Sequence, residues 1–560
     1  MTKQSFPVLN IQGGEKSMQN HVQKVFRYHE ETKHHFHRFA RSSGYMDWKN
    51  QPGPFRFYGG KKALPLPLLK KDPPAAYRHL YEKTEDVRPF TEENIGGFLE
   101  LSLGLSAWKS AGNSRRALRM NPSSGNLHPT EAHLLLPAME KSASGIYHYN
   151  PLLHALEPRA ELREELWEKI RKHFQTEIFF IALGSIFWRE SWKYGERALR
   201  YCLLDSGHAL AALRFSANIF GWKLSCLSAL SDADTETLLG FDRMQWHETE
   251  AEFPEVFCAV HAGEKEIPRQ IPDDILHDFS LLSFGGKTNA LSSRIIRWNL
   301  IYDTARSLRK PRTAEPAPVP ADIPFRCHAF SAPAAAEIIR RRRSALSFSG
   351  NVRMNTDDFL AILDKCLPRS SHSPFDAESG PSHVNLLLFV HSVAGLERGM
   401  YFFLRTDHPE KIRACTDPDL LWEQKEKDFP LYLLQKGDFR EKAIRLSCNQ
   451  GIAGYSIFSL GMIAVFRSLL EKEAFQYRKL FRECGMIGQV LYLEAAARGL
   501  RGTGIGCYYD DPVHECLSLP DNEFQSLYHF TLGHAVEDKG PADLPPYEHL
   551  KTERDGKEAG

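Results

Sequence analysis

The sequence predicts a chain of mixed helices and strands in which one domain occurs twice. Its 560 residues exceed the usual size of a single domain and suit two or three. Gly145-Ile-Tyr-His-Tyr matches Gly399-Met-Tyr-Phe-Phe, and the helical pattern over 207–221 matches that over 485–499, in the same order. A run with five prolines, 309–324, lies between the copies and favours an extended spacer. We therefore expect a fused dimer of one domain.

Each stretch of the chain has its own pattern. The segment 132–137 is strand-like, 145–151 reads as a strand that enters a turn, and 198–220 has the apolar spacing of a helix that Gly221 ends. The expected organisation is a lead segment over 1–65, a first domain over 66–270, a linker over 271–325, a second domain over 326–540 and a flexible tail over 541–560.

Composition excludes several classes of protein. Apolar residues make up 42% and charged residues 25%, as in soluble globular proteins, and the net charge of +1 gives no support for a nucleic-acid partner. No apolar run approaches the ~20 residues of a membrane span, so no membrane partner is expected. The ten cysteines form no CxxC pair, and dispersed thiols suit a reducing cytoplasm.

Four histidines in the lead segment raise the question of a metal site. His29, His34, His35 and His37 lie close in sequence but do not share one helical face, and no cluster of cysteines or matching acids accompanies them. We expect ordinary histidines and no metal.

The loop Pro122-Ser-Ser-Gly-Asn-Leu-His-Pro129 is the first candidate for binding. Proline and glycine favour an irregular loop, while Ser123, Ser124 and Asn126 supply small donors and acceptors for the edge of a flat polar ligand. Taken alone, the same composition also fits a plain turn before a strand.

Four consecutive arginines precede Ser344. Guanidinium groups bind phosphate through two hydrogen bonds, so Arg342 and Arg343 are candidates for an anion site. A solvated face of a charged helix is the alternative.

Two further segments carry candidate residues. Lys193 and Tyr194 are adjacent groups that can exchange protons when partly buried, although a Lys lying along the surface beside a core Tyr is equally compatible. Gly502-Thr-Gly-Ile-Gly506 follows a helix, lacks the strand–loop–helix order of a dinucleotide fingerprint, and lets backbone approach a planar cofactor closely.

Together these motifs resemble the nitroreductase superfamily, and most closely its SagB-type (McbC-like) dehydrogenases. The resemblance covers most of the chain. It rests on the lead segment, the loop 122–131, Lys193-Tyr-Gly-Glu-Arg197, Leu204-Asp-Ser-Gly-His208 and Arg342-Arg-Ser344. It implies an α+β fold that dimerises with FMN at the interface, here as an intrachain pseudo-dimer that is complete as a monomer.

The resemblance also implies roles for the candidate residues. Arg342, Arg343 and Ser344 would hold the phosphate and ribityl end of FMN. Pro122, Ser123, Ser124 and Asn126 would contact the isoalloxazine edge, and Gly504, Ile505 and Gly506 would lie near N5. Lys193 and Tyr194 would be catalytic. Leu346 stands where many members carry a second basic residue, which leaves the N1–O2 edge without an assigned charge.

The two halves differ in these motifs. The first half has the Pro-Ser-Ser loop but reads 78–88 without Arg-Arg-Ser, and 224–229 without the glycines. The second half has Arg342-Arg-Ser344 and the glycines, but reads 373–382 in place of the loop. We therefore expect one FMN site built across the halves and one that has lost function.

The expected activity is oxidation of a substrate C–H bond, azoline-like or in another small or peptidic molecule, with hydride transfer to flavin N5. An azole-forming cyclodehydratase is a candidate partner. Two alternatives remain: an NAD(P)H-dependent reductase of nitro compounds or quinones, and a non-catalytic protein that binds flavin or a peptide.

Overall fold

The computed structural model describes residues 11–111, 114–247, 249–314, 325, 330–406, 409–519, 522–536 and 543–550. Two seven-stranded antiparallel sheets dominate it, and six of the seven strands in each follow the same order, the edge strands β2 and β14 being the exception. The first sheet runs β2 (Leu64–Pro65), β7 (Ala155–Glu161), β6 (Gly145–Asn150), β5 (Thr130–Leu136), β8 (Ile178–Ser185), β10 (Phe253–His261) and β9 (Lys223–Cys226). The second runs β14 (Glu423–Glu426), β15 (Phe429–Lys436), β13 (Gly399–Phe403), β12 (Val384–Val390), β16 (Phe458–Val465), β18 (Phe524–Gly533) and β17 (Arg501–Ile505).

The predicted repeat is therefore confirmed. The matching Gly-x-Tyr segments are β6 and β13, which occupy the third place in their sheets. The two matching helical patterns lie in α5 (Ala198–Ile219) and α14 (Gln476–Ala497), each of 22 residues. Apart from the edge strands β2 and β14, the strands of the two sheets occur in the same chain order in both halves, as a duplicated domain requires.

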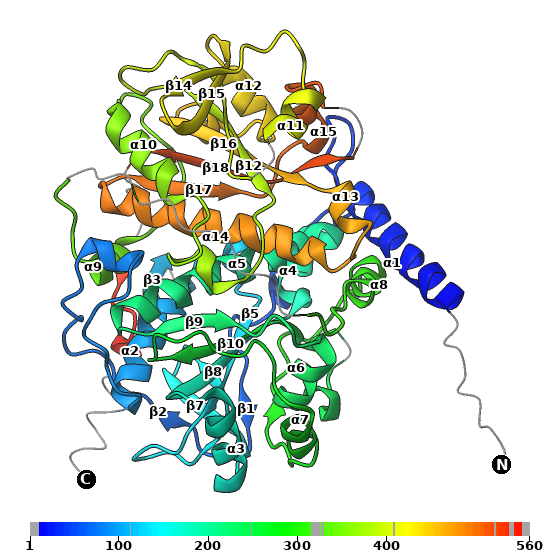
Figure 1. Cartoon of the computed structure of the whole chain (residues 1–560), viewed down its shortest axis with the longest axis vertical. Coiled ribbons are helices and arrows are strands. Elements are labelled where there is room, and N and C mark those ends of the chain that lie inside the picture. The colour runs from blue at the N-terminus through cyan, green and yellow to red at the C-terminus, as the bar shows by residue number, and fades with distance from the viewer. Residues whose placement is uncertain are drawn as a thin grey trace, which may run out of the picture.

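The helices α5 and α14 pack against each other between the two sheets (Figure 1). Both are buried almost all round, because each lies on its own sheet and on the other helix. They cross at two glycines. A Cβ on Gly207 would lie 2.1 Å from the carbonyl oxygen of Arg482, and a Cβ on Gly485 would lie 2.2 Å from that of Leu204. Only glycine permits this close crossing, which joins the two halves into one core.

Shorter helices pack around the sheets and against the central pair α5 and α14. Those of the first half are α2 (Glu92–Ser102), α3 (Glu164–Phe174), α4 (Phe187–Tyr194), α6 (Asp232–Leu239), α7 (Asp273–Ser280) and α8 (Asn299–Ser307). Those of the second half are α9 (Ala335–Arg341), α10 (Thr356–Lys365), α11 (Pro409–Cys415), α12 (Arg440–Leu446), α13 (Arg467–Leu470) and α15 (Asp510–Glu515). Local sequence fixes several starts: Ser231 and Asp234 form a capping box on α6, and Asn355 caps α10.

The expected linker and tail are partly folded. Within 271–314, the helices α7 and α8 bury Ile275, Phe279 and Ile301 against the first half. In the same stretch β11 (Lys287–Thr288) pairs with β1 (Tyr58–Gly59). In the expected tail, β19 (Asp543–Leu544) pairs with β3 (Leu105–Ala111), which pairs with β4 (Ser114–Arg119). The remainder of the proline-rich run, 315–324, and residues 551–560 lie outside the described residues.

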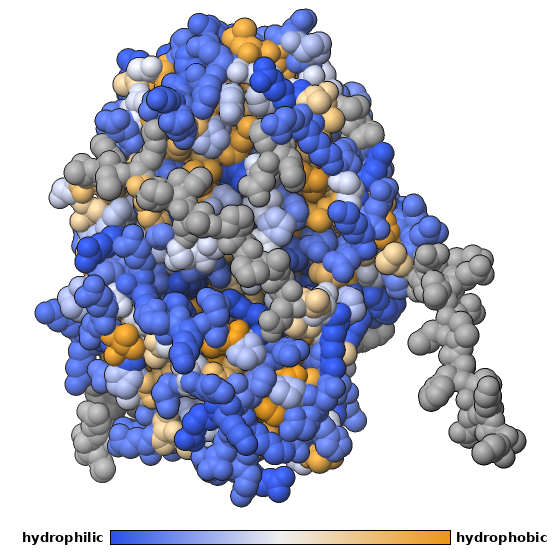
Figure 2. Space-filling view, viewed as in Figure 1, coloured by the Kyte–Doolittle hydropathy of each residue, from blue (hydrophilic) through white to orange (hydrophobic). Residues whose placement is uncertain are grey.

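The lead segment forms the helix α1 (Ile11–Glu31), which packs beside α8 and reaches the second sheet. Its Tyr28 hydroxyl donates to the carbonyl of Glu196, while His29 contacts the Gln525 amide oxygen at 3.0 Å. The visible face of the molecule is mostly hydrophilic, with hydrophobic side chains in small scattered groups (Figure 2). Within the part of the chain that the structure describes, no helix has the length and apolar character needed to cross a bilayer.

Candidate functional site

The Arg-Arg-Ser segment follows α9 and lies where the two halves meet. Ser344 forms a parallel bridge with Gly502 of β17, and Arg342 reaches into the first half, donating through Nε to Met120 O and through Nη2 to Arg119 O, both at 3.0 Å. Burial lowers the pKa of Arg342 to about 10, and no carboxylate among the described residues pairs with it. A buried guanidinium bonded only to carbonyl oxygens is a ready partner for an anion such as phosphate.

Arg343 and Ser344 point to different neighbours. Arg343 turns to Asp543 of β19, 3.0 Å from its Nε, and its Nη1 donates to the carbonyls of Arg340 and Arg342. The Ser344 hydroxyl lies 2.9 Å from the hydroxyl of Tyr492 on α14, which also accepts the N–H of Gly504 at 3.1 Å. Tyr492 thus links Ser344 to the glycine strand.

The glycines of β17 lie against tyrosine rings. A Cβ on Gly504 would be 1.7 Å from the hydroxyl oxygen of Tyr528, and one on Gly506 would be 2.0 Å from the ring of Tyr201. The Tyr201 hydroxyl donates to the Gly506 carbonyl at 3.1 Å. Ile505 is buried in the core of the second half. Glycine is therefore required at both flanking positions by packing.

The Pro-Ser-Ser loop adopts a conformation held by α5. The backbone N–H of Ser124 donates to Asp205 at 3.1 Å and its hydroxyl donates at 2.9 Å, while the Ser123 hydroxyl accepts the N–H of His128 at 2.8 Å. Gly125 and Asn126 both have positive φ, 60° and 59°. Burial raises the pKa of Asp205 to about 7. The loop after Pro122 is thus tied to a buried carboxyl group that changes charge near neutral pH.

Lys193 and Tyr194 end α4 directly over this loop. A Cβ on Gly125 would lie 2.7 Å from the Tyr194 hydroxyl and 3.1 Å from the Lys193 ammonium nitrogen. The rings of Tyr194 and Tyr201 lie 4.4 Å apart, centroid to centroid. Burial, with a contribution from the charge of Glu190, raises the pKa of Tyr194 well above its usual value, so its phenol keeps its proton at neutral pH.

The predicted residues therefore form one continuous region drawn from both halves, with Arg343 and the Ile505 side chain directed elsewhere. Their roles stay a prediction. Sequence reasoning missed four buried groups that join the segments: Tyr201, Asp205, Tyr492 and Tyr528. Asp205 gave a usable signal, because a charged residue inside an otherwise apolar helix needs a partner. The tyrosines gave none, because buried tyrosine is common in cores.

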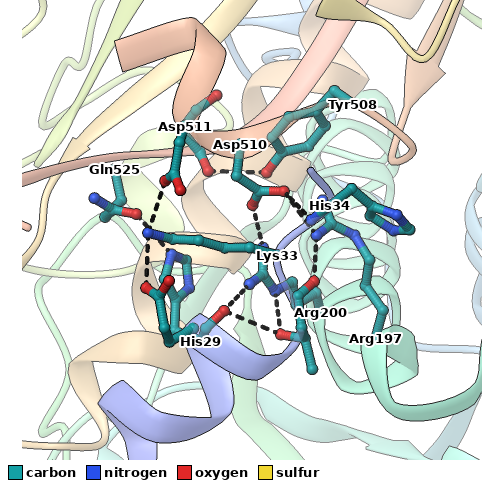
Figure 3. Close-up of polar contacts among 12 residues, drawn as sticks. His29, Lys33, His34, Arg197, Arg200, Tyr508, Asp510, Asp511 and Gln525 are labelled. Atoms are coloured by element: carbon teal, nitrogen blue, oxygen red, sulfur yellow. Dashed lines mark hydrogen bonds and ion pairs between the residues drawn. The ribbon is translucent and has the colours of Figure 1, made fainter. Parts of the chain in front are cut away.

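A buried ionic network fixes the end of β17 (Figure 3). Asp510 accepts from Arg197 at 3.0 Å, from Arg200 at 2.7 Å and from the His34 N–H at 2.9 Å. Arg197 also donates to the Gly506 carbonyl at 3.2 Å. Burial alone would raise the pKa of Asp510, but the two guanidinium groups hold it well below its usual value. The network ties the lead segment and α5 to the glycine strand.

The histidines of the lead segment lie beside this network. Among the described residues, ligand atoms of Glu30, His35 and Asp511 lie within 4.8 Å of one another. The Lys33 ammonium lies 2.8 Å from both Glu30 and Asp511. A cation of the protein thus already bridges the two carboxylates, and the cluster gives no support for a metal.

The corresponding region of the other half differs in its polar groups. There the backbone N–H of Arg88 donates to the carbonyl of Phe220 at the end of α5, whereas Ser344 bridges to Gly502 within β17. A cavity of about 380 Å³ opens between the halves. Two arginines that line it pair with acids of the chain, Arg478 with Asp232 at 2.6 Å and Arg482 with Glu378, whereas the Lys310 ammonium donates to the Leu230 carbonyl at 2.7 Å. Neither of these ion pairs resembles the contact between Ser124 and Asp205 that holds the Pro-Ser-Ser loop.

Comparisons with known proteins identify the fold. No family model and no curated protein matches the chain. A solved structure of a candidate nitroreductase from Anabaena variabilis matches 92% of this chain and 99% of its own, at 22% identity and a TM-score of 0.65. The chain has the nitroreductase fold, in two copies. The match spans both domains, so the expected fold class is confirmed.

Two further solved structures each match less than half of this chain. The match to a chain of the E. coli microcin synthetase McbBCD complex with truncated pro-MccB17 bound covers 39% of this chain and 79% of that chain, at 17% identity and a TM-score of 0.27. An NADPH:FMN oxidoreductase from Vibrio harveyi complexed with NAD⁺ covers 40% and 90%, at 16% identity and a TM-score of 0.22.

Proposed function

We propose that this chain is an FMN-dependent oxidoreductase with one flavin site, built from both halves. The observation that carries the proposal is Arg342. It is buried, it lacks a carboxylate partner among the described residues, and it lies beside Ser344 at the junction with the loop after Pro122. A phosphate would supply the missing anion. Arg342 and Ser344 supply a cation and a hydroxyl group for the phosphate end, and these residues therefore fit FMN.

Within that class we propose a SagB-type dehydrogenase acting on a small or peptidic substrate, with an azole-forming cyclodehydratase as a candidate partner. Bound FMN would supply hydride acceptance at N5. Tyr194 keeps its phenolic proton and so donates a hydrogen bond to the substrate. Lys193, beside it, would receive the proton that the substrate loses as it is oxidised. The loop 122–126 would line the substrate side of the site. The hydrogen bond from the Ser124 hydroxyl to Asp205 fixes the position of the loop.

The visible spectrum and flavin stoichiometry of the purified protein test the cofactor assignment. We expect one FMN per chain, released on denaturation. Two FMN per chain would overturn the single site, and a colourless protein that gains no flavin when mixed with FMN would overturn the cofactor.

A second experiment tests direction and roles. Anaerobic addition of an azoline-containing peptide should bleach the bound flavin, whereas rapid bleaching by NADPH would favour the reductase instead. Lys193→Ala and Tyr194→Phe should each slow the substrate-driven bleaching by at least about tenfold without loss of FMN. Unchanged turnover in both variants would remove the assigned catalytic roles.

A further inference from the structure

Two cysteines meet on neighbouring strands of the first sheet, β9 and β10, which lie side by side (Figure 1). Cys226 is the last residue of β9 and lies directly opposite Cys258 in the antiparallel register. Their sulfur atoms are 3.3 Å apart and share a hydrogen bond. Because the sequence has no CxxC motif, this pairing of thiols arises from the strand register alone.

The register also allows the two thiols to be joined. Directly opposite residues of an antiparallel pair have Cα atoms about 4.5–5.5 Å apart, and a disulfide bond accepts Cα separations of about 4.4–6.8 Å. The sulfur atoms have to approach from 3.3 Å to about 2.0 Å. β9 is a four-residue strand at the edge of its sheet, with β10 as its neighbour there, so Cys226 can move without breaking a second strand pairing within that sheet.

The two sulfur atoms differ in access. Cys226 lines the cavity of about 380 Å³ between the halves, whereas Cys258 is not part of the cavity wall and is fully buried. Burial, and then the hydrogen bond with Cys226, raises the pKa of the Cys258 thiol well above its usual value. A molecule in the cavity therefore meets Cys226 first, with the protonated thiol of Cys258 behind it.

The size of the opening limits the reagent. Cys226 is 4% exposed, so its sulfur is reached through the cavity rather than from the open surface. A bulky disulfide such as oxidised glutathione needs an exposed thiol, whereas a small hydroperoxide needs only a path to the sulfur.

We propose that Cys226 and Cys258 are a redox pair that a small hydroperoxide converts to a disulfide. Cys226 loses its proton, and its sulfur bonds to the OH-bearing oxygen of the peroxide as the O–O bond breaks. The product is a sulfenic acid, and the other oxygen leaves with the proton as water or an alcohol. The Cys258 sulfur then bonds to the Cys226 sulfur, the S–O bond breaks, and that oxygen leaves as water with the Cys258 proton. The two sulfurs give up two electrons, and the peroxide oxygens take them up.

The bond ties the edge strand covalently to its neighbour at the wall of the cavity. A thiol reductant reopens it, so the pair registers peroxide reversibly. None of the residues in this scheme belongs to the proposed flavin site. The purified chain can therefore be tested whatever its flavin content, and a failure of the flavin assignment leaves the result standing.

Peptide mapping of the peroxide-treated protein tests the bond. Cleavage by trypsin places the two cysteines in separate peptides, 224–243 and 244–265. After treatment with hydrogen peroxide, alkylation during denaturation and digestion without reductant, we expect these peptides to be linked, with the loss of two hydrogen atoms. Dithiothreitol should separate them, and untreated protein should give both peptides alkylated. Peptides that stay unlinked, or oxidation of Cys226 to a sulfinic acid without linkage, would overturn the proposal.

Two serine variants separate the roles of the thiols. In Cys258→Ser no thiol attacks the sulfenic acid, so dimedone should label Cys226 after peroxide treatment. In Cys226→Ser, Cys258 should stay unlabelled because it does not line the cavity. The control Cys366→Ser removes another fully buried thiol and should leave the link unchanged. Equal labelling of Cys226 and Cys258 would overturn the assigned order of attack.

The choice of oxidant is tested on the wild-type chain. Oxidised glutathione should leave both cysteine peptides unmodified under conditions in which hydrogen peroxide links them. A glutathione adduct on Cys226 would overturn the restriction to small oxidants. Because this comparison and the peptide map need no substitution, they decide the proposal if serine at either position prevents folding.

Discussion

The backbone at Gly504 packs so closely against the Tyr528 hydroxyl group that no side chain fits there. Because a Cβ there would lie 1.7 Å from the Tyr528 hydroxyl oxygen, Gly504→Ala must displace either β17 or Tyr528. We expect a loss of about 1–3 kcal/mol in the free energy of unfolding, measured by urea titration. Adding Tyr528→Phe, which removes the colliding oxygen, should recover part of the loss.

The control for this substitution is Gly53→Ala. Its Cβ would meet only the Leu291 carbonyl oxygen, at 3.7 Å, which is ordinary van der Waals contact. The two alanine variants should therefore differ clearly. Equal stabilities would show that the packing of Gly504 against Tyr528 does not constrain the strand.

Asp205 makes stability depend on pH in a defined direction. Its pKa is raised by burial from 3.8 to about 7 in the folded chain. Between these values the unfolded carboxyl group is ionised while the folded one keeps its proton, so the unfolded state binds fewer protons. The contribution of Asp205 to stability must then fall as pH rises through this window, by up to ~1.4 kcal/mol per pH unit.

Asp205→Asn removes this titration while retaining a side chain of the same shape. The stability difference between variant and wild type should shift in favour of the variant as the pH is raised from about 5 to about 7. Urea unfolding at both pH values measures it. A difference that is independent of pH would mean that Asp205 is ionised throughout and that its carboxylate is better solvated than its burial indicates.

At the scale of elements, the Asp510 network holds α1, α5 and β17 together. Asp510→Asn would leave Arg197 and Arg200 buried without their carboxylate, which costs about 3–5 kcal/mol in comparable cases. The variant should unfold at a lower urea concentration. The exposed pair Arg309–Glu236 is the control, and Glu236→Gln should cost less than about 1 kcal/mol. Similar losses in the free energy of unfolding of both variants would mean that the buried Asp510 network contributes no more stability than an exposed ion pair.

Some elements of the fold could be predicted from local sequence patterns, and others could not. The pattern over 198–220 predicted most of α5 because its apolar spacing is local, and the strand matched by 145–149 was recognised through its copy at 399–403. The folding of α7, α8 and β19 was missed, because each is short and is stabilised by contacts with the first half. The partnership of His34 with Asp510 spans 476 positions, and no local pattern encodes it.

At the scale of the whole molecule, the two halves share a fold and differ in chemistry. Duplication explains the shared strand order, whereas the candidate site needs a segment from each half. Sequence comparison of the halves could predict that a segment from each half meets at one junction, where Arg342 contacts Met120 and Arg119 just before the loop, while the roles of these residues stay a prediction. It could not predict Arg343, because the pairing of that residue with Asp543 depends on a strand formed by the chain end.

This asymmetry gives a matched pair of variants. Arg342 belongs to the Arg-Arg-Ser segment of the second half, and Arg88 ends the segment 78–88 that stands in its place in the first half. Arg342 is buried and donates to carbonyls of the opposite half, while Arg88 is partly exposed, lies over the ring of Phe220 and is 3.6 Å from Asp86. Only Arg342 is therefore left with an uncompensated buried charge for a phosphate to neutralise.

Arg342→Ala should then weaken FMN binding, by about 1.5–3 kcal/mol for a lost hydrogen bond to a charged group, which is roughly ten- to a hundredfold in Kd. Arg88→Ala should leave binding unchanged. Fluorescence quenching of added FMN by flavin-stripped protein measures both constants, and riboflavin, which lacks the phosphate, should bind wild type and Arg342→Ala equally. Equal weakening in both alanine variants would show that the loss does not come from a phosphate contact of Arg342, and the proposed site would lose its support.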